Sequence, residues 1–110
     1  MNFDMITNMI DIVQIAKALS DPIRYQIMLS LTQHAREEFP LHQENCCGGV
    51  CNCDIMAKFG LIQSRVSYHM KELVEAGLVV EVPRGRWKYY FVNTETLREF
   101  IAQLGREFGV

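Results

Sequence analysis

The most restrictive feature of the sequence is a pair of short helical segments joined by a glycine. Apolar periodicity predicts one helix over residues 54–59 and a second over residues 63–76, with Gly60 between them and Gly77 after the second. Glycine adopts the left-handed backbone conformations of tight turns and helix C-termini without steric cost. Two short helices connected in this way predict a helix-turn-helix over residues 52–77.

A basic hairpin follows the second helix. Residues 79–83 and 87–92 are rich in strand-forming side chains, and the turn between them reads Arg84-Gly85-Arg86. This pattern predicts a wing over residues 79–92. Three aromatic residues alternate along the second strand and are predicted to face the core: Trp87, Tyr89 and Phe91.

Longer amphipathic segments lie towards both ends of the chain. Helices are predicted over residues 6–19 and 94–108, and another after Pro22, which suits a first helical turn. With 110 residues and a hydrophobic content of 49%, the chain is expected to form one domain, residues 1–110. The two terminal helices carry more apolar surface than one core needs, which predicts a homodimer. The expected fold class is mainly α with a β-hairpin: a winged helix-turn-helix of about five helices and a two-stranded wing.

Charge and hydropathy limit where such a chain acts. The formal net charge is −2, but the segment from Lys58 to Tyr90 contains six basic residues and only three acidic ones. The first basic residue is Lys17, and no segment approaches the roughly 18 consecutive apolar residues of a membrane span. We therefore expect a cytoplasmic protein with no membrane partner and a locally basic surface.

The second helix of the helix-turn-helix has two chemically different faces. Val66, Met70 and Leu73 fall on one side, and polar or basic residues fall on the other side and its flanks. Such a helix suits the major groove of double-stranded DNA, and arginines at a hairpin tip can reach phosphates or the minor groove. The candidate DNA contacts are Gln63, Ser64, Arg65, Ser67, Tyr68, His69, Lys71, Arg84, Arg86 and Lys88.

Four cysteines lie within eight positions: Cys46, Cys47, Cys51 and Cys53. In the reducing cytosol such a cluster indicates metal ligands or a redox sensor rather than structural disulfides. Residues two apart point to opposed sides of a regular helix, so Cys51 and Cys53 can share one ion only if the turn is extended or distorted. Binding is therefore expected to deform the helix.

The ligand set narrows the choice of ion. Thiolates without histidine or carboxylate favour a thiophilic inducer, As(III) or Sb(III), with lead, bismuth, cadmium and mercury as alternatives. A closed four-thiolate zinc site is disfavoured, because four ligands within so short a stretch would strain a tetrahedron. No organic cofactor is expected.

Three segments together resemble the arsenic-repressor (ArsR/SmtB) family: residues 18–24 (ALSDPIR), 63–73 (QSRVSYHMKEL) and 75–79 (EAGLV). The resemblance implies a homodimeric winged helix repressor, dimerised by its first and last helices, that occupies a palindromic operator until an inducer ion releases it. It also implies that residues 51–54, Cys-Asn-Cys-Asp, are the family's metal box. Met56 stands where a third cysteine is expected, so the third thiolate must come from Cys46 or Cys47.

The sequence therefore predicts a metalloid-responsive repressor that binds operator DNA as a dimer. Three alternatives stay open: a repressor that responds to thiol oxidation or persulfides, a sensor of cadmium, lead, zinc, bismuth or mercury, and a metal-trafficking module that does not read DNA. An enzyme is not expected, because no cysteine–histidine pair, carboxylate pair or phosphate-binding loop has a catalytic spacing.

Overall fold

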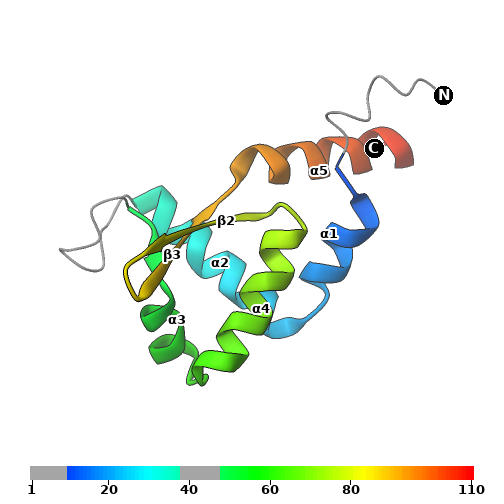
Figure 1. Cartoon of the computed structure of the whole chain (residues 1–110). Coiled ribbons are helices and arrows are strands. Elements are labelled where there is room, and N and C mark those ends of the chain that lie inside the picture. The colour runs from blue at the N-terminus through cyan, green and yellow to red at the C-terminus, as the bar shows by residue number, and fades with distance from the viewer. Residues whose placement is uncertain (1–9, 38–47) are drawn as a thin grey trace.

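The computed structural model describes residues 10–37 and 48–110 (Figure 1). Five helices and a three-stranded antiparallel sheet of order β1-β3-β2 make up these residues, which confirms the predicted fold class. In chain order the elements are α1 (Ile12–Leu19), α2 (Pro22–Glu37), β1 (Val50–Cys51), α3 (Asn52–Phe59), α4 (Gln63–Glu75), β2 (Val79–Arg84), β3 (Trp87–Val92) and α5 (Thr94–Phe108). Among the described residues no helix is long and apolar enough to cross a membrane.

Side-chain oxygen atoms cap the start of three of the helices. Asp11 caps α1, Asp21 caps α2 and Asn93 caps α5, each with an oxygen that accepts a backbone N–H of the first turn. These N–H groups have no partner inside the helix, so a cap contributes about 1 kcal/mol. Helix α1 therefore starts at Ile12, within the predicted range of 6–19, of which residues 6–9 lie outside the described part of the chain.

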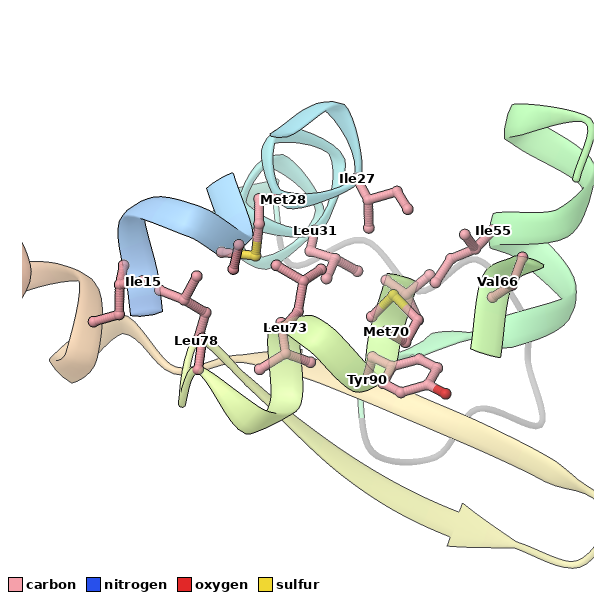
Figure 2. Close-up of a cluster of buried hydrophobic side chains, with 14 residues drawn as sticks. Ile15, Ile27, Met28, Leu31, Ile55, Val66, Met70, Leu73, Leu78 and Tyr90 are labelled. Atoms are coloured by element: carbon pink, nitrogen blue, oxygen red, sulfur yellow. The ribbon is translucent and has the colours of Figure 1, made fainter. Parts of the chain in front are cut away.

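The hydrophobic core lies between the first four helices and the sheet. Figure 2 shows side chains from α1, α2, α3, α4 and β3 that meet in this core. Ile15, Ile27 and Leu73 have no exposed surface. Burying a side chain of this size contributes roughly 1.5–3 kcal/mol, so these contacts fix α4 on the rest of the domain.

The sheet differs from the prediction in strand number. β2 and β3 form the expected hairpin, with Val79 opposite Val92 and Arg84 opposite Trp87, but β1 pairs with the other edge of β3. The wing, which we define as the β2–β3 hairpin, is therefore part of a three-stranded sheet. A Cβ atom on Gly49 would lie 2.7 Å from the Phe91 ring, so any other residue just before β1 would force this ring to move.

The aromatic side chains of β3 correct another prediction. Tyr90 is 2% exposed and belongs to the core, whereas Trp87 is 41% exposed. Tyr89 and Phe91 are half-buried. Both faces of β3 carry aromatic residues, so alternation alone does not identify the core face.

Candidate nucleic-acid interface and cysteine site

The surface predicted to contact DNA consists of α4 and the wing. The α3–α4 turn and the hairpin tip lie away from α5 (Figure 1). Arg86 lies with its guanidinium carbon 5.7 Å from the centre of the Trp87 ring, a distance typical of a cation–π contact. Nine of the ten predicted DNA contacts are exposed: Gln63, Ser64, Arg65, Ser67, Tyr68, Lys71, Arg84, Arg86 and Lys88.

His69 is the tenth predicted contact, and the structure removes it from this surface. Its side chain is 2% exposed because it lies on the apolar stripe of α4 with Val66 and Leu73. The Nδ1 atom lies 3.1 Å from Nη1 of Arg24. A guanidinium group only donates hydrogen bonds, so Nδ1 accepts and His69 is a neutral core residue.

Arg24 was not identified from the sequence, although it lies in the segment ALSDPIR. It is 8% exposed, and its Nε atom donates to the backbone carbonyl of Ala18 at 2.8 Å. Its guanidinium carbon also lies 5.8 Å from the ring centre of Tyr68 on α4. Arg24 therefore connects the α1–α2 corner to His69 and Tyr68 and positions α4.

Burial lowers the pKa of His69 below its ordinary value of 6.5, and the nearby positive charge of Arg24 lowers it further. The unfolded chain therefore binds a proton at a higher pH than the folded chain does. Stability is expected to be fully present above pH 6.5 and to fall as the pH drops below it, by at most about 1.4 kcal/mol per pH unit.

Urea unfolding between pH 7.5 and 5 tests this expectation. His69→Gln, which has no titrating ring, should show a shallower slope of unfolding free energy against pH than the wild type. Equal slopes in the two proteins would mean that His69 does not titrate differently on folding.

Cys51 and Cys53 converge at the start of α3. Cys51 ends β1 and is the N-cap of α3, with an extended backbone (φ −70°, ψ 144°), and Cys53 lies in the first turn. The two Cα atoms are 5.2 Å apart and the sulfur atoms are joined as a disulfide. The predicted helix distortion is therefore not needed for these two ligands, because Cys51 precedes the helix.

The chemistry of this pair fits a soft ion. Cys51 Sγ accepts a hydrogen bond from the backbone N–H of Cys53 at 3.2 Å, and the N-terminus of a helix favours a thiolate. Within residues 10–37 and 48–110, no group of three or more histidine, cysteine or acidic side chains is placed to hold a metal ion. The other two predicted ligands, Cys46 and Cys47, lie outside the described residues.

Asn52 joins the cysteine pair to the sheet, and the sequence analysis missed it. Its side chain is 5% exposed, and Oδ1 accepts a hydrogen bond from the backbone N–H of Lys88 on β3 at 3.2 Å. Cys51 Sγ lies 3.6 Å from the same oxygen, a distance at which its thiol form donates a hydrogen bond. A polar residue between two candidate ligands is the only signal of this role in the sequence.

Helices α1 and α5 leave an apolar surface exposed. They contact each other, and no residue of α5 in the described chain is buried. The exposed fractions are 68% for Val13, 66% for Ile101 and 76% for Phe108. This apolar face has no partner within one described chain.

The fold defines a class: a winged helix-turn-helix protein, with α4 as the second helix of the helix-turn-helix and the β2–β3 hairpin as the wing. Residues 46–80 match the family described as "Bacterial regulatory protein, arsR family". The arsenical resistance operon repressor of Bacillus subtilis is 33% identical over 87 residues, which cover 79% of this chain and 70% of that repressor. The chain belongs to the ArsR family of bacterial transcriptional regulators, and it is therefore a regulator and not an enzyme.

Two solved structures show the same fold. A possible transcriptional regulator for arsenical resistance superposes with a TM-score of 0.64 at 26% identity, covering 88% of this chain and 84% of that one. A homodimeric winged helix-turn-helix DNA-binding domain from Mycobacterium bovis superposes with a TM-score of 0.61 at 23% identity, covering 86% and 77%.

Proposed function

We propose that this protein is a cytoplasmic repressor that binds double-stranded operator DNA as a homodimer and releases it when As(III), or Sb(III), binds its cysteine cluster. The observation that carries the proposal is the convergence of Cys51 and Cys53 at the first helix of the helix-turn-helix. An ion bound there acts directly on the element that supports α4. The arsenical resistance repressor from Bacillus subtilis, to which the chain is similar, supports a metalloid as the inducer.

The ion would be held by thiolates alone. Cys51 and Cys53 supply two, and we assign the third to Cys46 or Cys47. When bound, the ion supplies a rigid link between these sulfur atoms, and soft thiolate ligands favour As(III) and Sb(III). Cadmium, lead, mercury, bismuth and zinc are the other ions to compare.

In this proposal the whole chain, residues 1–110, is one domain that docks α4 in the major groove. The helix-turn-helix spans residues 52–77 and the wing residues 79–92. Paired half-sites would lie about one helical turn of DNA apart, roughly 34 Å. The nine exposed predicted contacts on α4 and the wing would touch bases or phosphates, whereas His69 would not.

The dimer would form through α1 and α5. Their exposed apolar side chains, including Val13, Ile101 and Phe108, would be covered by the same surface of a second copy. The winged helix-turn-helix domain from Mycobacterium bovis, which has the same fold and is homodimeric, supports this assembly. The N-terminal part of the predicted dimer helix, residues 6–9, lies outside the described residues.

A second candidate function rests on the Cys51–Cys53 disulfide. A peroxide would oxidise the two thiols: the sulfur atoms bond to each other, and hydrogen peroxide takes up both protons and both electrons to become two waters. A dithiol reductant would reverse the reaction. A repressor of this kind releases DNA on oxidation without any metal.

Fluorescence anisotropy of the labelled upstream promoter region tests the proposal. The reduced protein should bind this DNA, and arsenite or antimonite should release it at lower concentrations than cadmium, lead or zinc do. Release by peroxide, with none by any ion, would support the redox function instead. Failure to bind this DNA or any operator-like palindrome would contradict the repressor assignment.

A further inference from the structure

Asn52 lies where the β1–β3 ladder ends and α3 begins. In the ladder Val50 is opposite Tyr90 and Cys51 is opposite Tyr89. The next pair in this register is Asn52 and Lys88, but the backbone of Asn52 is already helical. The side chain of Asn52 replaces the backbone as the acceptor for β3, because its Oδ1 accepts a hydrogen bond from the Lys88 N–H at 3.2 Å.

The same oxygen is also the neighbour of the Cys51 sulfur, at 3.6 Å. Asn52 is 5% exposed and Cys51 is 1% exposed, so bulk water has little access to either group. A change in the hydrogen bonding of the Cys51 sulfur therefore changes the hydrogen bonding of Oδ1 to the Lys88 N–H. Lys88 lies on β3, two residues after Arg86 in the wing turn.

We propose that Asn52 is a positioning residue that relays ligation of Cys51 to the wing. The inference rests on the proposed function, because it needs an ion at Cys51. In the reduced protein, the Cys51 thiol donates a hydrogen bond to Oδ1. A sulfur that is bound to an ion has no hydrogen to donate and presents only lone pairs to Oδ1, so its contact with the amide oxygen becomes repulsive.

Rotation of the amide relieves this repulsion. The Asn52 NH2 group then faces the sulfur and donates to it, and Oδ1 leaves the Lys88 N–H. The Lys88 N–H then loses a part-buried hydrogen bond, and a group partly shielded from water is only partly compensated by solvent. The Lys88 N–H needs another acceptor, so β3 shifts, and the wing, of which β3 is a strand, moves as well.

The variant that tests the relay is Asn52→Asp, compared with Asn93→Asp. An aspartate at position 52 accepts from Lys88 with either oxygen and has no NH2 group, so rotation changes nothing. Asn93 also accepts a backbone N–H with Oδ1, from Thr96 at 3.2 Å, but at the start of α5 instead of the start of α3. The two substitutions therefore differ in their position relative to the ion.

Three quantities are measured at saturating arsenite: arsenic bound per chain, from ultraviolet absorption of the arsenic–thiolate bonds; operator affinity with and without arsenite; and the amide chemical shift of Lys88 in an isotope-labelled chain. In the wild type and in Asn93→Asp, arsenite should move the Lys88 amide signal and release DNA. In Asn52→Asp, arsenite should still bind, the Lys88 signal should stay in place, and release should be weaker by up to about tenfold, the effect of losing one hydrogen bond.

Arsenite-induced release of the same size in Asn52→Asp and the wild type overturns the relay. A Lys88 signal that does not move in the wild type also overturns it, even if the variant does not fold. If arsenite binds the wild type and leaves its operator affinity unchanged, the proposed function fails as well, and this is recognised from the wild type alone.

Discussion

Cys51→Ser and Cys53→Ser should each bind operator DNA as tightly as the wild type and should not release it when arsenite is added. Serine has nearly the size and shape of cysteine but is a hard ligand that holds As(III) poorly. At position 51 serine is also a favoured N-cap, so α3 should form normally. The loss equals the whole coupling between the two sites, typically about 1–3 kcal/mol or roughly 5- to 150-fold in affinity.

Anisotropy titrations with and without arsenite measure this effect under reducing conditions. Cys46→Ser and Cys47→Ser, made singly, identify the third ligand by which of them also loses release. Release that persists in both Cys51→Ser and Cys53→Ser would refute the assignment of the ion to the start of α3.

Arg24→Met should destabilise the protein and weaken DNA binding together. The substitution leaves the His69 Nδ1 atom and the Ala18 carbonyl without their donor, and it removes the cation beside the Tyr68 ring. Buried groups that lose a charged partner cost about 1.5–3 kcal/mol each. We expect the free energy of unfolding to fall by about 3 kcal/mol, since Arg24 keeps some solvent contact.

A double-mutant cycle separates this contact from general damage to the core. The single variant His69→Leu and the double variant Arg24→Met with His69→Leu are unfolded in urea beside the wild type. The double variant should be more stable than the sum of the two single losses predicts, because no orphaned imidazole remains. Strictly additive losses would show that Arg24 and His69 do not depend on each other.

Local patterns were sufficient for much of the fold and for part of the candidate site. The apolar stripe of α4 was predicted from spacing alone, since Val66, Met70 and Leu73 recur at the period of a helix and are all buried. The Cys51–Cys53 pair was identified from the clustering of the cysteines, and it converges because Cys51 lies in extended backbone before α3. Three helix starts depend on capping oxygens within three residues of the N–H groups that they accept.

Other features were decided only by packing between distant segments. His69 was assigned to the DNA surface because a residue between the apolar and polar faces of a helix can be either buried or exposed. Tyr90 was missed because β3 has aromatic residues on both faces, and the sequence does not show which face packs against the core. β1 was missed because two residues carry no periodicity, and only pairing with β3 makes them a strand.

The sequence by itself thus determined the helix-turn-helix, the hairpin with its basic tip, the exposed polar residues of α4 except His69, and the place of Cys51 and Cys53 at the start of α3, because each depends on neighbours along the chain. The tertiary structure alone decided which polar groups are buried and how they are satisfied. Arg24 meets His69 across 45 positions, and Asn52 meets Lys88 across 36. Most buried donors pair with an acceptor wherever the fold provides one, and no local pattern encodes where that is.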